Sequence, residues 1–205
     1  MSRVVDVLAA QRYACRRLHG DHLLIDFECG HGGALADWLA RHALPYQQED
    51  LCAVWVMSPL DDDCAVHGYF TLSSHVIALD EVNRRDRRED PANGNRVNSV
   101  GRAPAQLLGK FAVDSNLQGS GLATLMMLAA YDHFLASAEH AASKYLVVEA
   151  REPKIVSYYE SKYGFVRTTH SRELTSLYRT TAAVRADVER AAAMVPPQDL
   201  ASEAS

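Results

Sequence analysis

The sequence predicts an α/β fold in which helices flank one mixed central β-sheet. Its 205 residues suffice for one sizeable core, and 48% hydrophobic with 23% charged residues is ordinary globular composition. Short apolar, β-branched runs alternate with segments whose apolar residues recur at helical spacing. This mixed order of strands and helices is typical of a single domain built around one sheet.

In the first half of the chain we expect a domain that starts at residue 22, after an N-terminal extension of residues 1–21. A turn at Pro59 joins two of the expected strands, and Gly68 marks a bulge in the second of them. The expected elements are strands at His22–Phe27, Ala53–Met57 and Ala65–Ile77, and a helix from about Ala34 to His42.

The second half predicts an alternation of strands and helices, followed by a C-terminal helix and a polar tail at residues 180–205. The domain itself therefore spans residues 22–179. Its expected strands are Gln106–Val113, Tyr145–Glu149, Phe165–Arg167 and Glu173–Arg179, and its helices run from Gly121 to about Ala138 and from Pro153 to about Ser161.

Charge, cysteine and histidine patterns exclude several classes of protein. The net charge of −5 argues against a surface made wholly for nucleic acid, although residues 84–102 hold six arginines and carry +3. No apolar run is long enough for a membrane span. The four cysteines fit reduced thiols in a cytoplasmic protein, and no histidine or cysteine spacing predicts a metal site.

The segment that carries chemistry is Gln118–Ala123, here named the glycine loop. It follows a strand that ends at Val113 and opens the long helix. Gly119 and Gly121 let the backbone run close to a ligand, and the free N–H groups of a helix start attract an anion such as a diphosphate. The spacing is neither that of a dinucleotide fold nor that of a P-loop.

The glycine loop resembles the Gln/Arg-x-x-Gly-x-Gly/Ala signature of the GNAT superfamily of acetyltransferases, with Gln118, Gly121 and Ala123 in the signature positions. The segment Glu149–Phe165, with its closing Gly-Phe, looks like the fifth strand and fourth helix of that superfamily. Phe27-Glu-Cys-Gly and His67-Gly-Tyr-Phe-Thr-Leu are similar to its toxin-type branch, whose members acetylate aminoacyl-tRNA in bacterial toxin–antitoxin pairs. The likeness covers roughly residues 22–179.

The resemblance implies a sheet splayed between its fourth and fifth strands, with acetyl-CoA bound in the gap. The pantetheine arm would lie along the strand that ends at Val113, and the pyrophosphate would lie on the N–H groups of the glycine loop. The implied cofactor-binding residues are Phe111, Ala112, Val113, Gln118, Gly119, Ser120, Gly121, Leu122 and Ala123.

By the mechanism of the superfamily, an amine attacks the thioester directly and a tyrosine protonates the leaving thiolate. Counting forward from the fifth strand places this tyrosine at Tyr159, and Tyr158 remains an alternative. Counting back from Gly164 reaches Glu160 instead, so this chain has one extra residue between the tyrosine and the Gly-Phe. Glu149 is the candidate general base, and a solvent-exposed carboxylate at a strand end is an equal interpretation. Tyr163 is expected to pack in the core.

Three functions agree with these features. The first is a toxin-type enzyme that acetylates aminoacyl-tRNA, in which the arginines of residues 84–102 contact tRNA phosphates and an antitoxin is the protein partner. The second is an acetyltransferase for a small amine, a peptide or a protein amine. The third is an acetyl-CoA-binding regulator without turnover. A homodimer through the C-terminal helix or the sheet edge agrees with any of them.

Overall fold

The structure, a computed structural model, describes residues 3–30, 33–87, 101–169 and 174–194. In these ranges seven strands form one sheet in the order β1-β2-β3-β4-β5-β7-β6. Every neighbouring pair is antiparallel except β4 and β5, which are parallel. The strands are β1 (Tyr13–Arg17), β2 (Ala53–Pro59), β3 (Gly68–Ala78), β4 (Arg102–Val113), β5 (Tyr145–Ala150), β6 (Val166–Arg167) and β7 (Thr175–Thr180).

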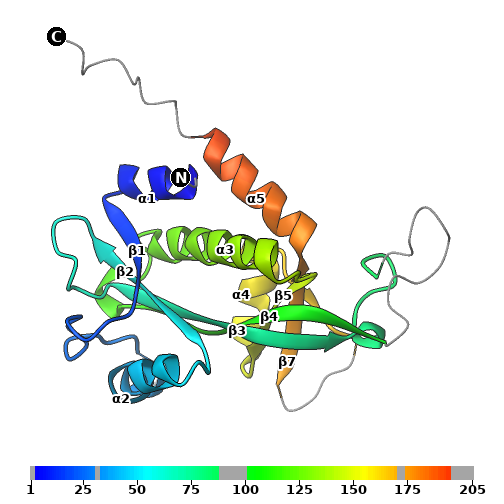
Figure 1. The fold of residues 1–205 in the computed structure, drawn as a ribbon, viewed down its shortest axis with the longest axis horizontal. Coiled ribbons are helices and arrows are strands. Elements are labelled where there is room, and N and C mark those ends of the chain that lie inside the picture. Colours follow the sequence, from blue (N-terminus) through cyan, green and yellow to red (C-terminus); the bar gives the residue numbers. More distant parts are fainter. Residues whose placement is uncertain (1–2, 31–32, 88–100, 170–173, 195–205) are drawn as a thin grey trace, which may run out of the picture.

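Helices cover both faces of the sheet (Figure 1). On one side α1, α3 and α5 lie together, and their buried residues Leu8, Met126 and Val184 belong to one apolar cluster. On the other side α2 packs Leu39 against β2 and β3. The helices are α1 (Arg3–Ala10), α2 (Ala34–Gln48), α3 (Leu122–His140), α4 (Pro153–Tyr163) and α5 (Thr181–Ala193).

The predicted α/β class with one mixed sheet is confirmed, but the predicted first strand is wrong. His22–Phe27 is a loop whose Leu23 makes only an isolated bridge to Ala65, and Ile25 is 89% exposed. The first strand is instead β1, which pairs along its whole length with β2. Residues 3–17 precede the boundary that we expected at residue 22, yet they belong to the sheet and its helical layer.

The later elements agree with the sequence, with shifted ends. β4 begins four residues earlier than predicted, and α2 continues through Pro45 to Gln48. The expected C-terminal helix is α5, and the tail at residues 195–205 lies outside the described residues. Within the described ranges, none of the helices combines the length and the apolarity that crossing a bilayer requires.

Candidate active site

β4 separates from β5 at a β-bulge. Pairing of the two strands stops at Leu108 and Val148, although both strands continue. On the opposite edge of β4, Gly109 and Lys110 together oppose the single residue Thr71 of β3. The Lys110 N–H donates to Thr71 Oγ1 at 2.9 Å, which stabilises the irregular pairing. Because a bulge bends its strand, β4 and β5 diverge beyond Leu108, and the predicted splay is confirmed.

The bulge that we predicted at Gly68 is wrong. Gly68 pairs in register with Val113, and the irregularity lies farther along the β3–β4 ladder. A Cβ at Gly68 would stand 2.9 Å from Met126 Sδ. Gly68 therefore lets α3 pack closely on the sheet.

A pocket of about 720 Å³ occupies the split between β4 and β5. Its walls are the end of β4, the glycine loop, the end of β5 and one face of α4. Most residues of the predicted site line it, namely Phe111, Ala112, Val113, Gln118, Gly119, Gly121, Ala123, Glu149, Tyr158 and Tyr159. The fold thus brings residues 108–123 together with residues 149–162, which are separate in the sequence.

The glycine loop forms one end of this pocket and leads into α3. Gly119 and Gly121 have φ values of 84° and 95°, a left-handed conformation that favours glycine. A Cβ on either residue would meet no protein atom within 4 Å, so the space beside the loop is open to a ligand. In the described part of the chain, the N–H groups of Gly119, Gly121 and Ala123 have no acceptor. This loop at a helix start can therefore bind an anion.

Ser120 and Leu122 are the two predicted cofactor-binding residues that do not line the pocket. The Leu122 N–H donates to Ser120 Oγ at 3.3 Å, and the Leu122 side chain is buried in the core. Ser120 Oγ in turn donates to Leu117 O at 2.7 Å. These bonds give the first N–H of α3 an acceptor and hold the loop in shape.

The segment Phe27–Gly30 is hydrogen-bonded to the glycine loop and to the residue that follows β4. Gln118 Nε2 donates to Cys29 O at 3.2 Å and to Val113 O at 3.3 Å. Asp114 Oδ2 accepts from the Glu28 N–H at 3.1 Å. The glutamine of the signature therefore connects the loop to the end of β4 and to the segment before α2.

Tyr159 lies in an aromatic group at the wall of the pocket. Its ring centroid is 6.4 Å from that of Phe111 and 5.5 Å from that of Phe165, and the residue is 8% exposed. Burial raises the pKa of the Tyr159 phenol, so the group keeps its proton at neutral pH. Its hydroxyl has no hydrogen-bond partner among the described residues.

Tyr158 and Tyr163 share a hydrogen bond. Their hydroxyl oxygens lie 3.1 Å apart, and the Tyr163 hydroxyl donates to Ala123 O at 3.2 Å. Tyr163 is buried in the core, as predicted, but its hydroxyl contacts the glycine loop. The sequence carried no signal for this contact, because the two residues lie 40 positions apart.

Glu149 stands at the end of β5, one residue past the last pair with β4. Its side chain is exposed and lines the pocket. Within the described ranges no hydrogen bond or ion pair engages its carboxylate. The group is therefore free to accept a proton from a molecule in the pocket.

Nothing in the sequence indicated the basic residues that line this pocket. Four of them line the pocket beside two carboxylates, Glu149 and Glu152. This excess of positive charge suits the diphosphate and 3′-phosphate of a coenzyme A. In the sequence these residues are scattered among acidic ones, so only the fold gathers them. They are Lys110, Arg151, Lys154 and Lys162.

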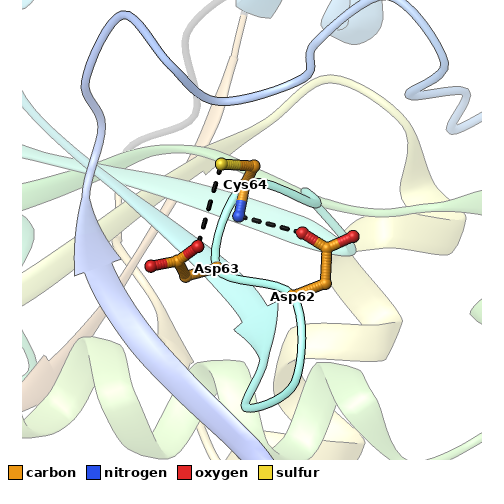
Figure 2. Close-up of side chains that lie close together, drawn as sticks. All are labelled: Asp62, Asp63 and Cys64. Atoms are coloured by element: carbon orange, nitrogen blue, oxygen red, sulfur yellow. Dashed lines mark hydrogen bonds between the residues drawn. The ribbon is translucent and has the colours of Figure 1, made fainter.

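Asp62, Asp63 and Cys64 gather three potential metal-ligand atoms outside the pocket (Figure 2). Asp62 Oδ1 accepts from the Cys64 N–H at 3.1 Å, and the Cys64 thiol donates to Asp63 Oδ1 at 3.7 Å. Burial and the nearby carboxylates raise the pKa of the thiol, which fits a protonated Cys64 that donates to Asp63. The contacts are those of a turn, and we assign no metal to it.

The arginine-rich segment is only partly described, and its described arginines differ in role. We predicted that Arg87 contacts a tRNA phosphate. Its guanidinium instead donates to two backbone carbonyls close by in the sequence, Val82 O at 2.7 Å and Asp80 O at 3.0 Å. Arg84 and Arg85 are exposed. Arg88 and Arg96 lie outside the described residues. The segment joins β3 to β4 at the end of β4 remote from the pocket.

The helix-flanked mixed sheet, split between β4 and β5 with a glycine loop at the split, defines the fold of GNAT acetyltransferases. Solved structures similar to this chain are bacterial toxins of that fold. AtaT complexed with acetyl-methionyl-tRNAfMet is 22% identical with a TM-score of 0.70, over 85% of this chain and 98% of AtaT. A tyrosine-to-phenylalanine variant of KacT is 18% identical with a TM-score of 0.70, over 86% and 99%.

A third similar structure is AtaTR bound with AcCoA, at 21% identity and a TM-score of 0.69, over 86% of this chain and 98% of that one. No family model matches the sequence. At these identities the likeness shows the fold.

Proposed function

We propose that this protein is an N-acetyltransferase that uses acetyl-CoA. The observation that carries the proposal is the pocket in the split of the sheet, with unpaired N–H groups at one end and Tyr159 and Glu149 in its walls. The N–H groups of Gly119, Gly121 and Ala123 would hold the diphosphate. The edge of β4 beyond Leu108, which no longer pairs with β5, offers its main chain to the pantetheine arm.

Acetyl-CoA supplies a thioester, and the residues of this chain move two protons around it. Glu149 accepts a proton from the attacking amine, directly or through a water. As the new C–N bond forms and the C–S bond breaks, Tyr159 gives its proton to the leaving sulfur. Burial raises the pKa of the Tyr159 phenol, so the donor is in its protonated form at neutral pH.

For the acceptor we propose the amine of an aminoacyl-tRNA. The proposal is supported by the fold, which AtaT shares in its complex with acetyl-methionyl-tRNAfMet. Arg84 and Arg85 supply exposed positive charge at the far end of β4, a strand of 12 residues. The pocket begins at Leu108, and at about 3.3 Å per residue the stretch of β4 from Arg102 to Leu108 spans about 20 Å. These arginines would therefore contact phosphates well away from the aminoacyl end.

Two further proposals follow from an aminoacyl-tRNA acceptor. The protein would act in the cytoplasm, where charged tRNA is found. An antitoxin would bind it, as the C-terminus of the antitoxin AtaR binds a tyrosine-to-phenylalanine variant of the AtaT toxin. A homodimer stays a prediction from the sequence.

The test is incubation with acetyl-CoA and charged tRNA, followed by detection of acetylated aminoacyl ends. The proposal expects acetylated ends with the parent protein and a large loss with Tyr159→Phe. Acetylation of a free polyamine, peptide or lysine, with none on tRNA, would show that the protein is an acetyltransferase with a different acceptor. Binding of acetyl-CoA without transfer to any amine would support the function of an acetyl-CoA-binding regulator and would contradict the proposed enzymatic function.

A further inference from the structure

We infer that the C-terminal helix α5 positions the tyrosine helix α4 against the glycine loop through one continuous line of contacts. The line runs from Asp187 through Arg179 and Tyr163 to Ala123. It joins α5, β7, α4 and the start of α3. The inference rests on the proposed function, because α4 and the glycine loop form two walls of the proposed acetyl-CoA site.

Tyr163, the last residue of α4, is the centre of the line. Its hydroxyl donates to Ala123 O at 3.2 Å, which connects the helix end to the glycine loop. Its main-chain oxygen accepts from Arg179 Nη1, which connects the same residue to β7. One side chain and one carbonyl thus fix α4 at its C-terminal end in two directions.

Arg179 of β7 and Asp187 of α5 form the end of the line of contacts farthest from the glycine loop. Arg179 Nη2 donates to Asp187 Oδ2, and the side chains are 12% and 20% exposed. The guanidinium carbon also lies 6.0 Å from the centre of the Tyr131 ring of α3. Asp187 also accepts from Arg190 Nη2 of its own helix, so it is the loss of Asp187 that would leave a largely buried charge, the Arg179 guanidinium, without its carboxylate. The contact between Arg179 and Asp187 fixes α5 to β7.

Gly164 makes room for this line. It ends α4 with φ 66°, and a Cβ there would overlap the guanidinium of Arg179. The next N–H, that of Phe165, donates to Tyr159 O at 3.2 Å. The Gly-Phe pair therefore transmits the position of Arg179 to the turn of α4 that carries Tyr159.

Arg179 and Asp187 do not line the pocket, so both are positioning residues that act through Tyr163. A shift of about 1 Å in a reacting group far from the mutation can lower a rate about a hundredfold. Helix α5, which follows the part of the chain that resembles GNAT enzymes, would in this way control the geometry between the glycine loop and Tyr159.

The test is a double-mutant cycle of Asp187→Asn and Tyr163→Phe. We expect each variant to lower kcat about tenfold, with the KM for acetyl-CoA nearly unchanged, and the double variant to lose no more than either one. Both should also speed amide hydrogen exchange at residues 118–123 in the absence of ligand. Glu189→Gln removes an exposed carboxylate from the same helix and should change neither quantity.

Additive losses, or a lower melting temperature with unchanged kcat and unchanged exchange at residues 118–123, would overturn the inference. The exchange measurement needs no activity, so it tests the line even if the parent transfers no acetyl group and the proposed function fails. If Asp187→Asn does not fold, Arg179→Lys replaces it, since lysine keeps the charge but cannot contact Tyr163 and Asp187 together.

Discussion

The rings of Phe111 and Tyr159 meet edge to face, with centroids 6.4 Å apart and planes at 66°. Phe111 belongs to β4 beyond the bulge, and Tyr159 belongs to α4. The two side chains therefore approach the split from its two sides. A thioester lying along β4 would come within reach of the Tyr159 hydroxyl, which has no partner among the described residues.

Tyr159→Phe should lower kcat by about 10²–10⁴-fold, because it keeps the ring and removes the proton donor. Acetyl-CoA affinity should stay close to that of the parent. Tyr158→Phe is the matched control, since Tyr158 lines the same pocket but its hydroxyl already contacts Tyr163. A large loss in Tyr158→Phe with a normal rate in Tyr159→Phe would assign the acid to Tyr158.

Gly121→Gln should weaken acetyl-CoA binding. The left-handed backbone at φ 95° costs a non-glycine residue about 1–2 kcal/mol. Loss of one or two charge-assisted bonds of about 1.5–3 kcal/mol each would lower the affinity at least about tenfold. Calorimetry with Gly20→Gln as control checks this, because Gly20 has open space around it and no positive φ. Equal affinity in Gly121→Gln and the parent would show that the glycine loop does not bind the diphosphate.

The dependence of kcat on pH should show no alkaline fall below about pH 10, the ordinary phenol value. Burial raises the pKa of Tyr159, and the reaction needs its protonated form. Because burial disfavours the charged phenolate, the folded protein should lose stability relative to the unfolded chain as the pH rises above the ordinary phenol value toward the raised pKa. Rates and thermal melts from pH 6 to 10.5 test both points. A fall in kcat with an apparent pKa under 9 would contradict the role of Tyr159.

Reversing Arg84 and Arg85 to glutamate should weaken tRNA binding and flatten its salt dependence. Each phosphate contact contributes roughly 0.7–0.9 to the slope of log affinity against log salt, so the slope should fall by about two contacts' worth. Acetyl-CoA affinity should not change. Arg185→Glu, at an exposed position on α5, is the control for the effect of one such charge reversal on the slope. An unchanged slope would remove these arginines from the tRNA contact.

The sequence predicts the part of the fold that builds the pocket. Gly121 precedes α3, and Pro153 and Gly164 mark the two ends of α4. β4 and β5 contain apolar runs, and Gln118–Ala123 is a local motif that the sequence shows by itself. The edge strand β1 was missed because Tyr-Ala-Cys-Arg-Arg shows little apolar alternation, and only pairing with β2 makes it a strand. His22–Phe27 misled for the opposite reason, since its apolar residues Leu23 and Ile25 stay exposed.

Contacts between distant segments were beyond prediction from one sequence. The bulge depends on Thr71 opposite Gly109 and Lys110, and nothing in either strand alone indicates this register. The hydroxyl of Tyr163 finds Ala123 only because α4 and α3 meet at the split. The sequence does not distinguish Arg87 from the neighbouring arginines, but in the structure its guanidinium donates hydrogen bonds to backbone carbonyls.

The most direct test of the account is a crystal structure of this protein with coenzyme A. We predict the diphosphate oxygens about 3 Å from the N–H groups of Gly119, Gly121 and Ala123. The thiol end should lie in the split between Phe111 and Tyr159. Coenzyme A bound elsewhere, for example in the separate pocket lined by Trp55 and His133, would contradict the account.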